Sequence, residues 1–325
     1  MDIFATAAQN LTTPMILCFV LGLAAALARS DLSVPEAMAK AMSLYLLFAI
    51  GFKGGVSVAG HGFDAQLGLS LLAGVALSFA LPLVAFGLLR VLTNLSALDA
   101  AAVSAHYGSI SIVTFVTATT TLAQQGIASE GYMVAVAAAM EAPAIVSALW
   151  LAARSGAGRR MDARLWHEIL LNGSIVLLVG SFLIGMITGQ DGMARIDSFI
   201  VAPFQGVLCL FLLDMGLVAG RGLRGSRGVL GLGTLAFGVL MPVVGAGFGL
   251  AVGLVLGLSA GGAALMMVLC ASASYIAVPA AMRVALPEAN PALYLTLSLG
   301  VTFPFNLIIG IPAYVAIATA VTGAA

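Results

Sequence analysis

The chain has 325 residues, of which 62% are hydrophobic and 8% are charged. Soluble domains contain about 45–50% apolar residues, so this composition predicts a protein embedded in a membrane. Lys and Arg number 13, and so do Asp and Glu. Without an excess of positive charge the chain has little to attract nucleic-acid phosphates, which excludes nucleic-acid binding as a function.

Apolar runs long enough to cross a hydrocarbon core of about 30 Å predict an all-α membrane protein with ten transmembrane helices. Their expected positions are residues 10–29, 39–59, 66–90, 99–124, 130–153, 167–189, 197–220, 228–257, 261–284 and 290–321. The last span contains Pro304 and Pro312, which predict a kink or an interruption.

Basic residues fall almost entirely in the loops on one side of these spans, namely Arg29, Lys40, Arg90, Arg154, Arg159, Arg160, Arg164, Arg221, Arg224, Arg227 and Arg283. The opposite side has Arg195, with Lys53 near the end of the second span. Positively charged loops remain in the cytoplasm, so both termini are expected to face the periplasm. The basic loop at residues 153–168 either fixes this topology or serves as a docking place for a regulatory partner.

Each half of the chain contains five predicted spans, so a duplicated half would lie upside down relative to its twin. Local similarities support a duplication: AIGFKGG resembles DMGLVAG, GSISIV resembles ASASYI, and EAP resembles TFP, at residues 49–55 and 214–220, 108–113 and 271–276, and 141–143 and 302–304. We therefore expect a first inverted repeat in residues 1–153, a cytoplasmic linker in 154–166 and a second repeat in 167–325.

Inverted repeats with small polar interruptions at matching positions are typical of secondary transporters. A helix broken inside the membrane exposes backbone groups, which is tolerable only where they line a cavity or meet a ligand. Two such half-helix N-termini would attract an anion, while nearby carbonyl and hydroxyl oxygens suit Na⁺. The alternative is that the serines bond back to the preceding turn and the glycines mark close packing.

Ionisable and amide side chains inside the spans are further candidates, because a charge there costs about 2.5 kcal/mol or more. Glu141 follows the first predicted break and is a sodium-binding candidate, and Asn306 lies in the matching span. Lys53 and Asp214 could form a structural ion pair or take part in transport. His106 could relay protons, but we favour a hydrogen bond that holds the break.

Four ordered segments carry a resemblance to a known family: YLLFAIGFKGG, HYGSISIVTF, PFQGVLCLFLLDMG and CASASYIAVPAAMR, at residues 45–55, 106–115, 203–216 and 270–283. They resemble the sodium-dependent bicarbonate transporters of the SbtA family. The resemblance implies two inverted five-helix repeats with crossed broken helices, core and scaffold domains that move like an elevator, and a homotrimer. It also implies a PII-like cytoplasmic regulator.

The resemblance places substrate binding at the two predicted breaks, on Gly108, Ser109, Ser111, Ala271, Ser272 and Ser274. Ser109 and Ser272, with Glu141 and Asn306, are the sodium-binding candidates. The expected function is symport of Na⁺ and HCO₃⁻ into a bacterium across its inner membrane, among membrane lipids and without a cofactor. The alternatives are symport of another small anion, such as an organic carboxylate, and cation/proton antiport. An enzyme is not expected, because the chain has no HExxH or GxSxG motif.

Overall fold

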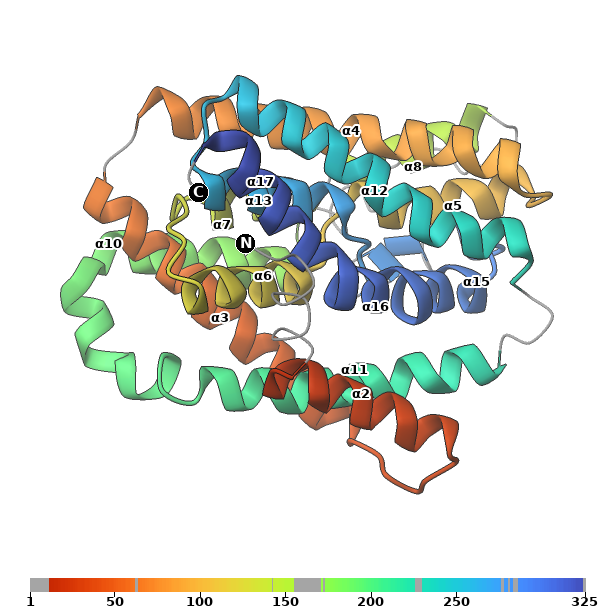
Figure 1. Ribbon diagram of the computed structural model, residues 1–325, viewed down its shortest axis with the longest axis horizontal. Coiled ribbons are helices and arrows are strands. Elements are labelled where there is room, and N and C mark those ends of the chain that lie inside the picture. The colour runs from red at the N-terminus through yellow and green to blue at the C-terminus, as the bar shows by residue number, and fades with distance from the viewer. Residues whose placement is uncertain are drawn as a thin grey trace.

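The computed structural model describes residues 12–61, 64–141, 143–154, 171, 173–225, 230–275, 278–279, 281–282 and 286–323. All regular structure in these residues is helical, as predicted (Figure 1). The helices are α2 (Pro14–Leu27), α3 (Glu36–His61), α4 (Ala65–Leu92), α5 (Ala97–Gly108), α6 (Ile112–Gln124), α7 (Met133–Ala139), α8 (Pro143–Arg154), α10 (Gly173–Ile200), α11 (Phe204–Gly225), α12 (Leu232–Val255), α13 (Ala260–Ala271), α15 (Pro291–Thr296), α16 (Phe303–Phe305) and α17 (Ile311–Thr322).

Eight candidate membrane spans are found in the described residues, fewer than the ten expected. The first and ninth predicted spans coincide with α2 and α13, apolar helices of 14 and 12 residues that are shorter than a full crossing. The broken helices α5 with α6, and α7 with α8, each make up one candidate span. Most of the predicted linker at residues 154–166 lies outside the described residues.

The sixth span was predicted to end at residue 189, where the structure has a kink, but the expected start of the seventh span at residue 197 is wrong. Polar residues after Gly189 suggested a loop, but α10 continues to Ile200, and α11 begins at Phe204 rather than at residue 197. The helix axis changes direction at Gly189, whose φ of 57° and ψ of −150° suit glycine better than any other residue. The polar segment is thus a second helical piece that follows the break at Gly189.

The last span is interrupted, as its prolines predicted. Two π-helical segments, Leu297–Thr302 and Asn306–Gly310, flank α16, which contains Pro304. Proline has no N–H to donate, so the regular bonding of an α-helix cannot pass through it. Wider π turns inside helices are frequent at functional sites.

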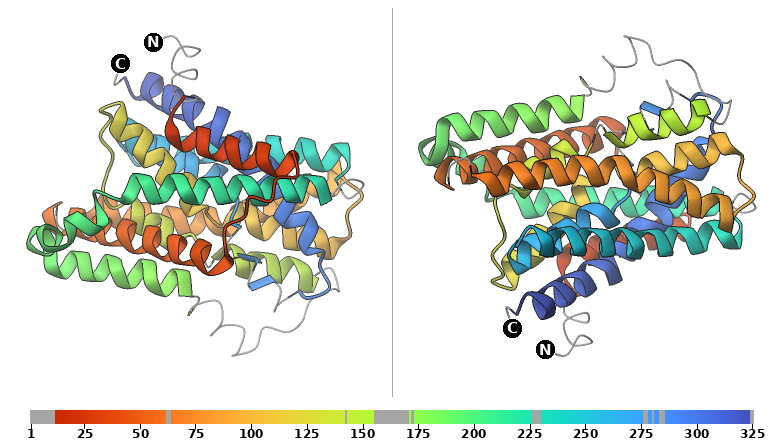
Figure 2. Two further views of the ribbon diagram at one scale, coloured as in Figure 1. Left: turned by 90° about the horizontal axis from the view of Figure 1, so that it is seen from below. Right: turned by 90° about the horizontal axis from the view of Figure 1, so that it is seen from above.

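Helices α2, α11, α3 and α10 pack in that order across one side of the molecule (Figure 2). We call them the four-helix group, and the remaining helices the broken-helix group. Glycines make the tightest contacts within the four-helix group. An added Cβ would collide with the carbonyl of Phe182 at Gly55 on α3, and with the carbonyl of Phe19 at Gly216 on α11.

The glycine contacts of the two helix pairs are alike. Gly185 of α10 abuts the backbone of Phe52 in α3, and Gly22 of α2 abuts the backbone of Leu213 in α11. Helix α3 therefore crosses α10 in the way that α11 crosses α2. The glycines that matched in sequence occupy matching places in the two pairs.

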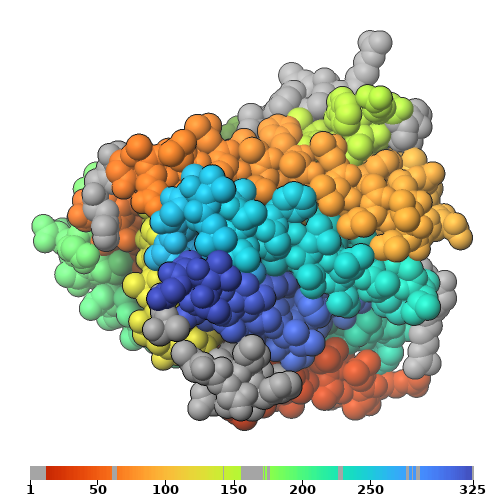
Figure 3. Space-filling view, turned by 45° about the horizontal axis from the view of Figure 1, so that its top comes forward, coloured from red at the N-terminus to blue at the C-terminus, as the bar shows by residue number. Residues whose placement is uncertain are grey.

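The outer face of the broken-helix group is apolar. Helices α4, α12 and α17 lie side by side on it (Figure 3). Large hydrophobic side chains are exposed along them, including Leu72, Leu83, Val243, Phe248 and Ile317. A surface of this kind is stable against lipid or another protein rather than water.

Candidate functional site

Both predicted interruptions exist, and they begin in the same way. Helix α5 starts after Ser96, whose hydroxyl accepts from the N–H of Asp99, and α13 starts after Ser259, whose hydroxyl accepts from the N–H of Gly262. Each helix has 12 residues. Each then ends at a serine in extended conformation, Ser109 and Ser272.

The break after α5 is short and ends with a capped half-helix. Ser111 is extended, and its hydroxyl accepts from the N–H of Thr114 at 3.2 Å and from the Thr114 hydroxyl at 2.8 Å. This cap starts α6 inside the buried part of the protein. The positive end of the α6 dipole therefore lies at the break, where it favours a negative ligand.

The two breaks touch each other, and we call this contact the crossing. Ser111 donates its backbone N–H to the Ser272 hydroxyl at 3.0 Å, and Ser274 donates its backbone N–H to the His106 carbonyl at 2.7 Å. The Nδ1 atom of His106 also bonds to the Ser274 carbonyl, at 2.5 Å. Segments about 160 residues apart in sequence thus satisfy each other's backbone groups.

Two polar atoms at the crossing are buried without a hydrogen bond, His106 Nε2 and Ser109 Oγ. The buried hydroxyl of Tyr275 lies beside Ser111. Each of the two atoms without a hydrogen bond costs about 1–3 kcal/mol relative to one with a partner. Their concentration at one place is readily explained if a polar ligand completes their bonds.

Gly108 and Ala271 hold neighbouring helices close to the crossing. A Cβ at Gly108 would collide with the ring of Pro82 in α4 and come within 2.9 Å of Ala144 in α8. The carbonyl of Ala271 accepts from Asn306 Nδ2 at 2.8 Å. The described contacts therefore give both residues a packing role beside the predicted binding role.

Two of the predicted sodium ligands, Ser109 and Ser272, lie at the crossing, and the other two, Glu141 and Asn306, come from the interrupted spans. Glu141 precedes α8 one turn before Ala144, the residue that abuts Gly108; it is buried, and its Oε2 makes no hydrogen bond. Asn306 is buried and bonds the end of α13. Its Oδ1 also accepts from the Tyr314 hydroxyl at 3.1 Å.

Lys53 and Asp214 are not brought together. The Lys53 ammonium lies 4.3 Å from the ring centroid of Phe204, at the start of α11. Asp214 is ten residues further along that helix, or about 15 Å at 1.5 Å per residue. The two side chains therefore form no direct ion pair, which was one of the two roles that the sequence suggested for them.

A cavity of about 540 Å³ opens between the two groups of helices and extends to Tyr275, next to Ser274. Arg221 and Gly222 of α11 line one side, and Thr296 and Leu299 line the other. We did not name Tyr275, Arg221 or Thr296 as site residues from the sequence. The position of Tyr275 inside the polar ASASY segment was the one available signal for it.

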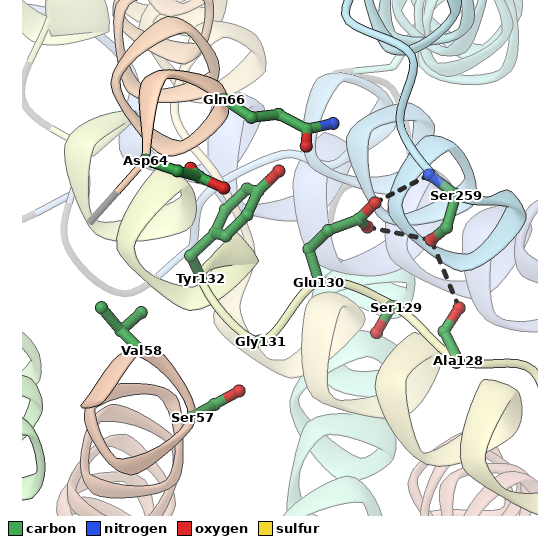
Figure 4. A pocket seen from close by; sticks show the side chains of 10 residues that line it. All are labelled: Ser57, Val58, Asp64, Gln66, Ala128, Ser129, Glu130, Gly131, Tyr132 and Ser259. Atoms are coloured by element: carbon green, nitrogen blue, oxygen red, sulfur yellow. Dashed lines mark hydrogen bonds between the residues drawn. The ribbon is translucent and has the colours of Figure 1, made fainter. Parts of the chain in front are cut away.

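A smaller cavity of about 280 Å³ lies at the opposite end of the molecule (Figure 4). Its polar lining includes Asp64, Tyr132 and Glu130, whose carboxylate accepts from the N–H and the hydroxyl of Ser259 at 2.7 and 3.0 Å. Beside it Ser57 of α3 packs against Gly131, where no Cβ would fit. The two groups are thus in close contact at this end.

Interrupted helices that meet at a buried polar crossing, in a chain with several candidate spans, define a multi-pass membrane protein of the transporter class. A family profile, described as the Na⁺-dependent bicarbonate transporter superfamily, matches residues 14–319. The chain belongs to this superfamily, which confirms the resemblance seen in the sequence. The superfamily is one of transporters and not of enzymes. A search of curated proteins finds no significant match.

Proposed function

We propose that the protein is a symporter that imports bicarbonate with Na⁺ across the inner membrane of a bacterium, with both termini in the periplasm. The crossing carries the proposal. It combines a half-helix N-terminus at Ser111 with buried polar atoms on His106 and Ser109 that make no hydrogen bond. Family membership supports the choice of ions.

Bicarbonate suits such a site on chemical grounds. The anion is small and planar, and its oxygens accept bonds from hydroxyl and backbone N–H donors. The substrate-binding set is Gly108, Ser109, Ser111, Ala271, Ser272 and Ser274. Since no Lys or Arg belongs to this set, the neutralising charge would come from Na⁺ and from the helix dipole.

Sodium would bind beside the anion, at oxygens of Glu141, Asn306, Ser109 and Ser272. The buried Glu141 carboxylate and the Asn306 amide supply hard oxygen ligands of the type that Na⁺ prefers. Because the two ions attract each other, each should strengthen the binding of the other by the same factor. This mutual effect would couple their transport, with no further cofactor.

Transport would proceed by an elevator-like motion of the broken-helix group against the four-helix group. The matched glycine contacts of α3 with α10 and of α11 with α2 support two inverted repeats, in residues 1–153 and 167–325 around a linker at 154–166. The larger cavity lies at the end with Arg221 and supports a state open to the cytoplasm. We further propose a homotrimer surrounded by lipid, with a PII-like protein as a cytoplasmic regulator.

Uptake of radiolabelled bicarbonate into proteoliposomes tests the function. Uptake should require an inward Na⁺ gradient and should fall at least tenfold in Ser109→Ala and Ser272→Ala. Uptake that does not depend on Na⁺ would contradict symport. Strong competition by acetate or a larger carboxylate would show that the substrate is an organic anion.

The buried Glu141 carboxylate, which makes no hydrogen bond through Oε2, gives one observation in favour of cation/proton antiport. Under that function a Na⁺ gradient would drive proton movement in liposomes without bicarbonate. Glu141→Gln would abolish this movement, whereas Ser109→Ala and Ser272→Ala would not. A pH-sensitive dye trapped in the liposomes distinguishes the two functions.

A further inference from the structure

The His106 imidazole is held in one orientation at the crossing. Its Nδ1 lies 2.5 Å from the Ser274 carbonyl oxygen, and its ring stacks on Tyr294 with centroids 4.6 Å apart and planes inclined by 28°. The side chain is fully buried. Both ring nitrogens therefore have fixed positions.

The bond to Ser274 decides which nitrogen carries the proton. A carbonyl oxygen only accepts hydrogen bonds, so Nδ1 must donate and must be protonated. In the described residues the ring contacts the Ser274 carbonyl and Tyr294, neither of which is a carboxylate, and a buried imidazolium without a carboxylate would be costly. The imidazole is therefore neutral, and Nε2 has a lone pair that accepts hydrogen bonds and donates none.

No donor in the described residues reaches that lone pair. His106 and Ser109 are three residues apart at the end of α5, which places them on the same side of the helix. Ser109 Oγ is likewise buried without a hydrogen bond. An acceptor and a hydroxyl without partners thus lie on one side of the last turn of α5, next to the crossing.

We propose that His106 Nε2 accepts the hydroxyl proton of bicarbonate and so determines the specificity of the site for a protonated anion. This inference rests on the proposed function. Among small planar monoanions, bicarbonate has an O–H group, whereas nitrate and formate have none. A lone pair repels their oxygens, and a site built to bond a hydroxyl rejects analogues that lack it.

The variant His106→Asn distinguishes the role of Nε2 from that of Nδ1. Its amide can still donate to the Ser274 carbonyl from near the Nδ1 position, but it has no atom at the position of Nε2. Tyr107→Phe is the matched control, because Tyr107 is equally buried on α5 but bonds Thr302 at 2.6 Å instead of the crossing. Each variant removes one polar group from a buried side chain, and the two substituted residues are neighbours in the sequence.

Na⁺-dependent uptake of labelled bicarbonate is measured with nitrate and formate as competitors. In the wild type both should compete weakly. In His106→Asn the affinity for bicarbonate should fall on the order of tenfold, as expected for one hydrogen bond to a charged ligand, while nitrate and formate compete as well as before or better. Tyr107→Phe should keep the wild-type preference. An unchanged preference in His106→Asn would overturn the proposal.

A second measurement does not depend on the variant being active. The ¹⁵N resonance of the unprotonated His106 nitrogen, assigned by its absence from His106→Asn, should shift with Na⁺ and bicarbonate and not with Na⁺ and nitrate. A protonated Nε2 in the free protein, or equal shifts with both anions, would contradict the proposal. Wild-type protein that takes up no bicarbonate would instead show that the proposed function is wrong.

Discussion

Ser111 and Ser272 are joined by a 3.0 Å hydrogen bond from the backbone N–H of the first to the hydroxyl of the second. The same hydroxyl donates to the carbonyl of Leu269 at 3.0 Å, within its own helix. One side chain thus fixes the end of α13 against the start of α6. The geometry of the proposed anion site depends on this link.

We expect Ser272→Ala to lower Na⁺-dependent uptake at least tenfold, because the Ser111 N–H loses its partner in a buried place. An orphaned buried donor costs about 1–3 kcal/mol. Ser298→Ala is the matched control, since the Ser298 hydroxyl is buried and makes no hydrogen bond. Uptake in that control should stay within about twofold of wild type. Equal effects of the two substitutions would speak against a special role for Ser272.

Gly185→Ala should destabilise the four-helix group. A Cβ at this position would collide with the backbone of Phe52 in α3, and overpacking of this kind costs about 1–3 kcal/mol. Gly180→Ala on the same helix meets no atom within 4 Å and should leave stability unchanged or slightly higher. Thermal unfolding in detergent, followed by tryptophan fluorescence, measures the difference. If both variants unfold at the same temperature, α3 and α10 do not pack as described.

Glu141→Gln should raise the Na⁺ concentration needed for half-maximal uptake about tenfold, because Na⁺ would lose a charged ligand. Glu130→Gln is the control. That carboxylate bonds Ser259 at the far end of the molecule, and the amide oxygen of glutamine can keep the bond from the Ser259 N–H. Its Na⁺ dependence should be unaltered. An unchanged Na⁺ dependence in Glu141→Gln would remove this residue from the sodium site.

Cysteines at positions 222 and 296 should lock the two groups of helices together. A Cβ at Gly222 would lie 3.9 Å from the Thr296 Cα and 3.3 Å from its Oγ1, which suits a disulfide. Oxidation of Gly222→Cys with Thr296→Cys should stop uptake, and dithiothreitol should restore it. The wild type, whose neighbouring Cys18 and Cys209 lie within the four-helix group, should remain active after the same oxidation. Unimpaired uptake in the cross-linked protein would exclude relative motion at this contact.

Short local patterns in the sequence predicted several features of the fold. The paired motifs around Ser109 and Ser272 identified both breaks, because small polar residues inside an apolar run conflict with a lipid-facing helix. Gly51 and Gly216, which match in the two halves of the sequence, lie where α3 approaches α10 and where α11 approaches α2 closely. Pro304 indicated the interruption of the last span through its missing N–H.

Other features depend on contacts that no local pattern reveals. The polar residues between Gly189 and Ile200 resemble a loop, yet they form a second helical piece of α10 after the break at Gly189. The stacking of His106 on Tyr294 and the approach of Ser57 to Gly131 join segments far apart in sequence. Lys53 and Asp214 carry opposite charges and could have formed an ion pair. Lys53 contacts the start of α11, however, and Asp214 lies ten residues further along that helix.

The hydrogen bonds at the crossing run from one half of the chain to the other. In an isolated half, the N–H groups of Ser111 and Ser274 would lack these hydrogen-bond partners inside the membrane, at a cost of several kcal/mol each. Neither half should therefore persist as a folded unit by itself. Under the proposed inverted-repeat architecture, an ancestor made of one such unit would have needed a second copy in the same membrane, inserted in the opposite orientation, before either could fold stably.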